Sequence, residues 1–231
     1  MGTRKRMEPR IIKWLGMALA RSAALALILG QVPAGLCFTD AADPRTIVFF
    51  GDSLTAGLGL PDPDTQSYPA QIQRKIDAGH LAWRVVNAGL SGETSAGGLR
   101  RIDWVMRQRI DVFVLELGGN DGLRGTATEV TRANLQAIID RVHSRYPAAR
   151  IILAGMRMPQ NMGPDYAEAF RAIYPALAQK NAAALIPFLL DGVAGKPELN
   201  QYDGIHPSPS GAAIIADEVW KIIQPILRND R

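Results

Sequence analysis

The chain has 231 residues, of which 47% are hydrophobic and 21% are charged, a balance that is typical of soluble globular proteins. This composition excludes collagen-like, disordered and polytopic membrane proteins, and the length suits a single domain with a sizeable core. The formal net charge is +4, but six of the 26 Lys and Arg residues and two of the 22 Asp and Glu residues lie within residues 1–42. The rest of the chain is therefore formally neutral, and we expect no nucleic acid among its partners.

Residues 1–42 have the pattern of a secretory signal peptide. A basic stretch precedes the apolar residues 14–32, which Arg21 interrupts, and small residues follow. The uninterrupted apolar part, residues 22–29, is too short to span a bilayer. We expect cleavage between residues 34 and 42, export to the periplasm or the medium of a bacterium, and no stable membrane insertion afterwards. An uncleaved N-terminal membrane anchor is the alternative.

From Thr46 onward, short runs of β-branched or aliphatic residues alternate with longer amphipathic stretches. Such alternation is typical of a parallel sheet with helices on both faces. It predicts strands at residues 46–50, 83–87, 112–117, 150–154 and 184–188. It also predicts helices at residues 68–78, 95–108, 128–146, 165–181 and 210–223, the last of which Pro225 should end.

Polar loops follow the predicted strands. Because ligands bind at the carboxyl ends of the strands in open parallel sheets, we expect these loops to meet at one edge. They are Gly-Asp-Ser-Leu at 51–54, Ala-Gly-Leu-Ser-Gly at 88–92, Gly-Gly-Asn-Asp-Gly at 118–122 and Met-Arg-Met-Pro at 156–159, together with Asp-Gly-Ile-His-Pro at 203–207 before the last helix.

Ser53 lies just past the first strand, where its hydroxyl can serve as a nucleophile. A serine hydroxyl needs a base to take its proton, and the base needs a carboxylate to orient it. Of the three histidines, His80 and His143 lie in polar or charged surroundings and are expected to be solvated, whereas Asp203 precedes His206 by three residues. We predict Ser53 as nucleophile, His206 as general base and then acid, and Asp203 as the group that orients His206.

Acyl transfer also needs hydrogen-bond donors for the oxyanion that forms in the reaction. The candidates are the backbone N–H groups of Ser53 and Gly89 and the side-chain amide of Asn120. No metal is expected, because no two histidines have the spacing of metal ligands and Cys37 is the single cysteine.

Three acidic residues in or near these loops are expected to have structural roles. Asp52 and Asp121 are expected to accept hydrogen bonds from loop amides and so to hold Ser53 and Asn120 in place. Glu116 is a carboxylate inside an apolar strand, which indicates a partnered structural role or a buried acid with a shifted pKa.

Residues near the fourth strand are candidates for contacts with the substrate. Met156, Met158, Met162 and Tyr166 either line a groove for an acyl chain or belong to the core. Arg157 either faces an anionic leaving group or is a solvated charge. Residues 61–64, Pro-Asp-Pro-Asp, are expected to form a surface turn.

Ser53, Gly89, Asn120 and His206 match the four residues for which the GDSL or SGNH hydrolases are named, and the chain resembles that family over most of residues 46–226. The segments at 114–125, 169–175 and 203–207 are similar to the branch of secreted bacterial arylesterases and multifunctional thioesterase/lysophospholipases. The resemblance implies a three-layer α/β/α fold with a flavodoxin-like, five-stranded parallel sheet. It also implies an Asp-His-Ser triad and no metal or cofactor.

We therefore expect residues 43–231 to form one hydrolase domain that cleaves small-molecule carboxylic esters and thioesters through an acyl-enzyme. The expected activities are those of an arylesterase, an acyl-CoA thioesterase or a lysophospholipase. The alternatives are a carbohydrate O-deacetylase on the same fold and a non-catalytic, flavodoxin-like binding module. The sequence makes no prediction of oligomeric state.

Overall fold

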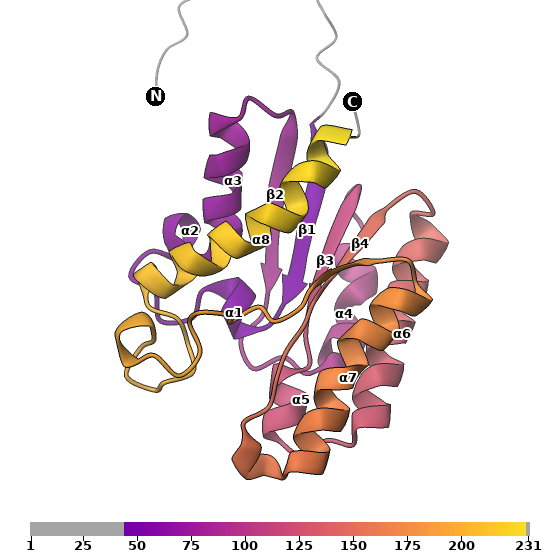
Figure 1. Ribbon diagram of the computed structural model, residues 1–231. Coiled ribbons are helices and arrows are strands. Elements are labelled where there is room, and N and C mark those ends of the chain that lie inside the picture. The colour runs from indigo at the N-terminus through magenta and orange to yellow at the C-terminus, as the bar shows by residue number, and fades with distance from the viewer. Residues whose placement is uncertain (1–43, 230–231) are drawn as a thin grey trace, which may run out of the picture. The chain divides into compact units, whose positions relative to one another are not determined.

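The structure, a computed structural model, describes residues 44–229. At its centre is a five-stranded sheet in the order β2-β1-β3-β4-β5, in which all neighbouring strands are parallel (Figure 1). The strands are β1 (Arg45–Gly51), β2 (Trp83–Gly89), β3 (Val112–Glu116), β4 (Arg150–Ala154) and β5 (Ala184–Ile186). The predictions of a signal peptide, its cleavage and an N-terminal anchor fall on residues 1–42 and lie outside the described residues.

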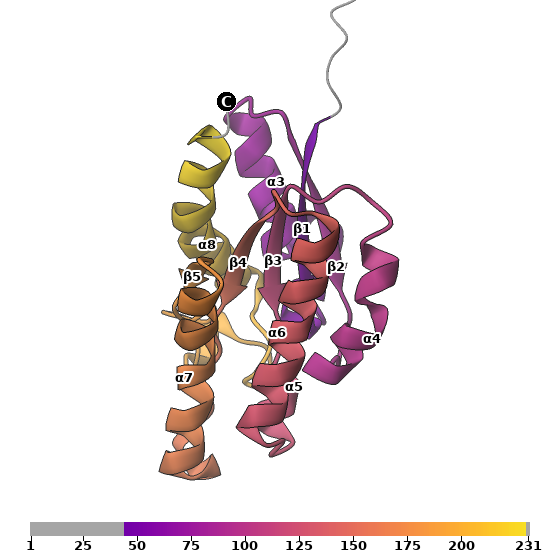
Figure 2. The same ribbon diagram turned by 90° about the vertical axis from the view of Figure 1, so that its right-hand side faces the viewer.

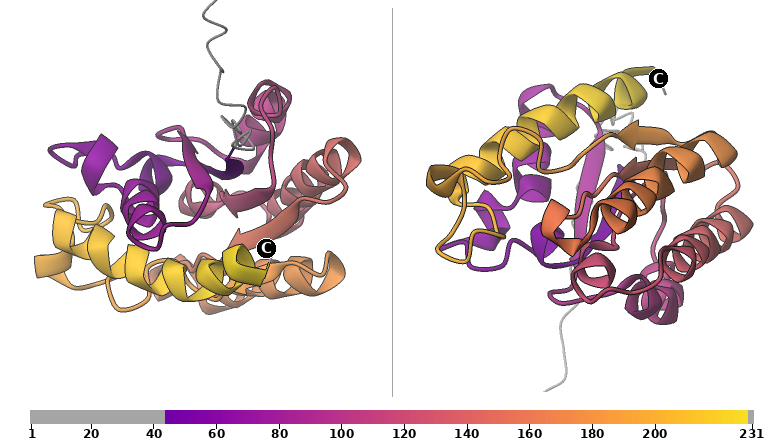
Figure 3. Two further views of the ribbon diagram at one scale, coloured as in Figure 1. Left: turned by 90° about the horizontal axis from the view of Figure 1, so that it is seen from above. Right: turned by 60° about the horizontal axis from the view of Figure 1, so that its bottom comes forward.

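Helices cover both faces of the sheet. In Figure 2, α8 lies to one side of the strands and α4 and α6 lie to the other, and the view from above in Figure 3 shows α8 running along its face. Helix α3 packs against α8, and α6 packs against both α4 and α7. The α-helices are α1 (Ser53–Ala56), α2 (Pro63–Gln66), α3 (Tyr68–Ala78), α4 (Ser95–Val105), α5 (Gly119–Leu123), α6 (Thr128–Arg145), α7 (Pro164–Lys180) and α8 (Pro209–Asn229), and the short 3-10 helices are η1 (Gln160–Met162) and η2 (Pro197–Leu199).

The strand sequences explain this layered arrangement. Six of the seven residues of β1 and all five of β3 are buried, as expected for central parallel strands that are covered on both faces. The predicted α/β class, the parallel five-stranded sheet and the three layers are confirmed. The strand order is that of flavodoxin-like sheets and reverses direction at β1, which marks the carboxyl ends of β1 and β3 as the place for a ligand.

Several predicted element boundaries differ from the observed ones, two of them for identifiable reasons. Pro225 does not end the last helix, which continues to Asn229. Its ring costs one backbone hydrogen bond, but Ile223 and Leu227 are both buried on the same side of α8, and their packing holds the helix together across the proline. The fifth strand ends at Ile186 because Pro187 has no N–H for the sheet.

Short helices also appear where loops were expected. Helix α2 begins inside the predicted surface turn at residues 61–64, and α1 and α5 follow directly after β1 and β3. Among residues 44–229, no helix is both long enough and apolar enough to cross a bilayer.

Candidate active site

Ser53 is the first residue of α1, directly after the end of β1. The carboxylate of Asp52 starts this helix, because its Oδ1 accepts a hydrogen bond from the Leu54 N–H at 3.0 Å. Gly57 ends it in a left-handed conformation, with φ of 78°, that glycine adopts without strain. The short helix therefore holds Ser53 at the carboxyl edge of the sheet, on the wall of a pocket.

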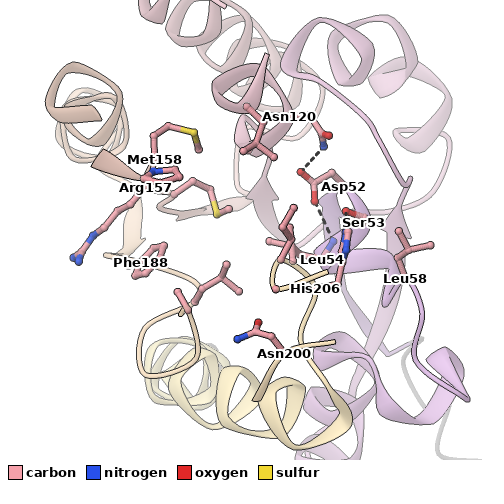
Figure 4. Close-up of a pocket in the computed structure, with 18 of the residues that line it drawn as sticks. Asp52, Ser53, Leu54, Leu58, Asn120, Arg157, Met158, Phe188, Asn200 and His206 are labelled. Carbon is pink, nitrogen blue, oxygen red and sulfur yellow. Dashed lines mark hydrogen bonds between the residues drawn. The ribbon is translucent and has the colours of Figure 1, made fainter. Parts of the chain in front are cut away.

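Ser53, His206 and Asp203 form a hydrogen-bonded chain. The Ser53 Oγ lies 2.8 Å from His206 Nε2, and His206 Nδ1 lies 2.6 Å from Asp203 Oδ2. Figure 4 shows His206 and Ser53 next to each other in the pocket. In this arrangement one ring nitrogen can accept the serine proton while the other nitrogen donates to a carboxylate.

The loop around His206 stabilises Asp203 as a carboxylate. Its Oδ1 accepts hydrogen bonds from the backbone N–H groups of Ile205, at 2.9 Å, and His206, at 3.0 Å. The His206 side chain and these two N–H groups lower the pKa of Asp203 to about 2. Asp203 is therefore ionised throughout the neutral pH range, and its position relative to the imidazole is fixed by three hydrogen bonds.

The side chain of Asn120 reaches the same pocket from α5. Its Nδ2 donates to Asp52 Oδ2 at 3.0 Å and to the Glu93 carbonyl oxygen at 3.0 Å (Figure 4 shows the bond to Asp52). Asp121, the next residue, accepts hydrogen bonds from the backbone N–H and the hydroxyl of Ser95, at 2.7 and 2.6 Å. The expectation that Asp52 and Asp121 hold their loops is confirmed.

The pocket next to Ser53 has a volume of about 630 Å³, within the range of small-molecule sites, and its lining is mostly apolar. Met156 and Met158 line it, whereas Met162 and Tyr166 do not, and the Tyr166 hydroxyl donates to the Thr126 carbonyl oxygen at 2.8 Å. The further apolar side chains on its wall are Leu54, Leu58, Leu123, Phe188, Leu190 and Ile205.

Arg157 stands at this pocket with its guanidinium over the Phe188 ring, 4.7 Å from the ring centroid. Its side chain is exposed, so the cation is accessible to a ligand as well as to solvent. Neither His80 nor His143 lines the pocket. Within residues 44–229 no group of three or more His, Cys, Asp or Glu side chains is arranged to hold a metal ion.

Comparison with known proteins identifies the family. The model of the GDSL-like Lipase/Acylhydrolase family matches residues 49–214. The chain belongs to this family. Because its members and the relatives described next are ester hydrolases by name, this protein is a carboxylic ester hydrolase, as predicted, and not a non-catalytic binding module.

This hydrolase is similar to two curated relatives and one solved structure of esterases and thioesterases. It is 38% identical over 211 residues to Esterase TesA of Pseudomonas aeruginosa, covering 91% of this chain and 99% of the relative. It is 39% identical over 191 residues to Thioesterase 1/protease 1/lysophospholipase L1 of Escherichia coli K12, covering 82% and 88%. The crystal structure of the psychrotrophic esterase EstA from Pseudoalteromonas sp., inhibited by monoethylphosphonate, superposes with a TM-score of 0.74 at 33% identity, covering 80% of this chain and 99% of that one.

Gly89, predicted as an oxyanion donor, does not line the pocket, whereas Ser53, Asn120 and His206 do. Its N–H donates to Asn87 Oδ1 at 3.0 Å, and a Cβ at this position would collide with the backbone of Ala56. Gly92, three residues further on in the loop after β2, lines the pocket together with Ser53 and Asn120. Gly89 thus permits close packing of β2 against α1, while Gly92 brings backbone to the pocket.

Sequence reasoning missed two residues that support the site. Gln201 Nε2 donates to the carbonyl oxygens of Leu58, at 2.7 Å, and Pro207, at 3.0 Å, and so ties the His206 loop to the loop after Ser53. Arg101 donates to Glu93 Oε2 at 2.6 Å and to the Ala88 carbonyl oxygen at 2.8 Å, which supports the loop that carries Gly92. The bond from Gln201 to Leu58 spans 143 residues, and the bonds of Arg101 depend on how the loop after β2 folds back on α4, so no local pattern marks either side chain.

Proposed function

We propose that this hydrolase cleaves esters and thioesters of apolar acyl chains through an acyl-enzyme on Ser53. The observation that carries the proposal is the distance of 2.8 Å between Ser53 Oγ and His206 Nε2, with Asp203 on the opposite side of the imidazole. This geometry supports Ser53 as nucleophile, His206 as general base and acid, and Asp203 as the group that orients and stabilises the imidazolium.

The reaction follows from these positions in two halves. His206 Nε2 accepts the proton of Ser53 as the hydroxyl oxygen attacks the carbonyl carbon, and His206 then donates that proton to the leaving alcohol or thiol. In the second half His206 accepts a proton from water, the resulting hydroxide attacks the acyl-enzyme, and the proton returns to Ser53 as the carboxylic acid leaves. No metal or cofactor takes part in the proposed steps.

The proposed oxyanion donors are the N–H of Ser53, the amide of Asn120 and one glycine N–H. We assign that N–H to Gly92 in preference to Gly89, because Gly92 lines the pocket and the Gly89 N–H is bonded to Asn87. Both hydrogens of Asn120 Nδ2 are engaged, with Asp52 and with the Glu93 carbonyl oxygen. The bond to Glu93 is therefore the one that Asn120 exchanges for the oxyanion, while Asp52 keeps the amide oriented.

The lining of the pocket supports an acyl chain as the group it binds. Burying apolar substrate surface against Met158, Leu190 and Phe188 is favourable by about 25 cal/mol per Å². Such a lining offers few hydrogen-bond partners to a sugar, which speaks against the carbohydrate O-deacetylase. Arg157 at the pocket is available to an anionic leaving group.

The proposal includes export. The signal-peptide pattern of residues 1–42 supports a mature domain of residues 43–231 in the periplasm or the medium. N-terminal sequencing of the protein recovered from these compartments of a bacterial host tests it, and a mature protein that still begins at Met1 would contradict it.

The activity is tested with purified protein on nitrophenyl butanoate, nitrophenyl decanoate and a decanoyl-CoA thioester. The wild type should cleave all three, and Ser53→Ala should lose at least about 10³-fold in kcat on each. Ser210→Ala, which removes an exposed hydroxyl on α8, is the matched control and should keep full activity. Full activity of Ser53→Ala would contradict the proposal.

A further inference from the structure

Glu116 is a fully buried acid at the end of β3, close to the residues that start α1. Its carboxyl group lies against Gly51, where a Cβ would collide with Glu116 Oε2 and with Thr55 Oγ1. The register of the sheet pairs Gly51 with Glu116 directly. The glycine that ends β1 therefore leaves the space that this carboxyl group occupies.

The hydrogen bonds to Glu116 are distributed unevenly over its two oxygens. Oε2 accepts two of them, from the Asp52 N–H at 3.1 Å and from the Thr55 hydroxyl at 2.8 Å. Oε1 is buried and has no donor in the described part of the chain. An ionised carboxylate would leave this oxygen charged and unsatisfied, which costs several kcal/mol, whereas a neutral acid carries its proton there.

Asp52 provides the acceptor for such a proton. Its Oδ1 accepts from the Leu54 N–H and its Oδ2 from Asn120 Nδ2, and its backbone N–H donates to Glu116 Oε2, which places the two carboxyl groups close together. Two buried carboxyl groups in contact cannot both ionise, so one of them keeps a proton. Burial raises the pKa of Asp52 to about 6 and raises that of Glu116 well above its ordinary range. Since Glu116 Oε1 has no donor while both Asp52 oxygens accept hydrogen bonds, the geometry assigns the proton to Glu116 and the negative charge to Asp52.

We propose that Glu116 is a positioning residue whose neutral carboxylic acid donates from Oε1 to Asp52, and that Asp52 in turn holds the amide of Asn120 in the pocket. Glu116 does not touch the substrate. Its effect passes through Asp52 to Asn120, so it depends on the proposed role of Asn120 as an oxyanion donor.

The test compares one variant that keeps a neutral hydrogen-bond donor at position 116 with one that removes it. Glu116→Gln keeps the length of the side chain and a neutral donor and acceptor, whereas Glu116→Met keeps the length alone. We expect Glu116→Gln to retain at least about a third of the wild-type kcat, and Glu116→Met to lose about 10- to 100-fold in kcat with KM changed less than about threefold. Equal losses in both variants, or wild-type kcat in Glu116→Met, would overturn the proposal.

A control variant and a spectroscopic measurement complete the kinetic test. Asp111→Asn makes the same carboxyl-to-amide change at the other end of β3, where Asp111 Oδ2 accepts from the Thr46 N–H at 2.8 Å, and should leave kcat unchanged. In the folded wild type at pH 7, infrared difference spectra against Glu116→Gln should contain the carbonyl band of a protonated carboxylic acid. Its absence would overturn the neutral state of Glu116 whatever the kinetics of the variants.

The outcomes also separate this inference from the proposed function. If the wild type fails to cleave the esters, the proposed function itself is wrong. If the wild type is active, Ser53→Ala is inactive and the Glu116 variants behave alike, only the role of Glu116 is wrong.

Discussion

His206 Nε2 lies 2.8 Å from Ser53 Oγ, although 153 residues separate the two in the sequence. Ser53 follows the central strand β1, and His206 precedes α8, which lies on one face of the sheet (Figure 1). The two meet because the carboxyl edge of β1 and the loop before α8 converge at one side of the pocket.

Asp203 is predicted to contribute mainly to kcat. Replacing it in Asp203→Asn removes the charge that stabilises the imidazolium and allows the wrong imidazole tautomer, so kcat should fall by about 10³- to 10⁴-fold with little change in KM. Steady-state kinetics on nitrophenyl butanoate measures this. The exposed Asp191→Asn is the control, and a loss below tenfold in Asp203→Asn would argue against the orienting role.

Asn120 is predicted to act in the transition state and not in substrate binding. Asn120→Ala removes one oxyanion donor, so kcat should fall by about 10²- to 10³-fold while KM stays within about threefold. Asn181→Ala provides the control, since Asn181 bonds to Gln136 at a distance from the pocket. A rise in KM with unchanged kcat would instead indicate a binding role for Asn120.

Met158 is predicted to determine the preference for acyl chain length. Met158→Gln keeps the size of the side chain but places a polar amide on the apolar wall, which must lose water when a long chain binds. We expect kcat/KM on the decanoate ester to fall about tenfold while that on the acetate ester changes less than about twofold. Met162→Gln, outside the pocket, should change neither rate, and equal losses on both esters would exclude an acyl-chain role.

Glu116 is predicted to make the stability of the protein depend on pH. Its pKa in the folded state is well above the ordinary value of 4.5, so the folded protein keeps a proton that the unfolded chain releases above that pH. Stability of the wild type should therefore fall as pH rises, and Glu116→Gln should not share this loss.

Urea unfolding of both proteins between pH 7 and 9, above the pKa of about 6 of Asp52, measures the difference. The free energy of unfolding of Glu116→Gln relative to the wild type should rise by up to about 1.4 kcal/mol per pH unit. A difference that stays constant over this range would mean that Glu116 is already ionised in the folded protein.

The sequence predicts well the framework and which residues come together at the pocket, because their signals are local. Alternating apolar runs give the five strands, and the spacing of Asp203 and His206 places both on one loop, where their side chains are 2.6 Å apart. Gly89 ends β2 and Gly92 follows three residues later, and only the fold tells which of the two reaches the pocket. The interpretation of Gly89 could not be decided from sequence, since it depends on the backbone of Ala56 in another element.

The partners of Glu116 are hidden from sequence for the same reason. A lone acid in the apolar run of β3 indicates a buried carboxyl group that needs hydrogen-bond partners. Its contacts with Asp52 and Thr55, however, depend on the register between β1 and β3. The continuation of α8 past Pro225 likewise depends on tertiary packing, through Leu227, and not on helix propensity.

Covalent labelling identifies the nucleophile, which we propose is Ser53. The wild type is inactivated with an ethyl phosphonate probe and digested, and the modified peptide is identified by mass spectrometry. We expect one phosphonate group on Ser53, in proportion to lost esterase activity, and no labelling of His206→Ala on the same time scale. Complete inactivation with the label on another residue, or full labelling of Ser53 with activity retained, would contradict this proposal.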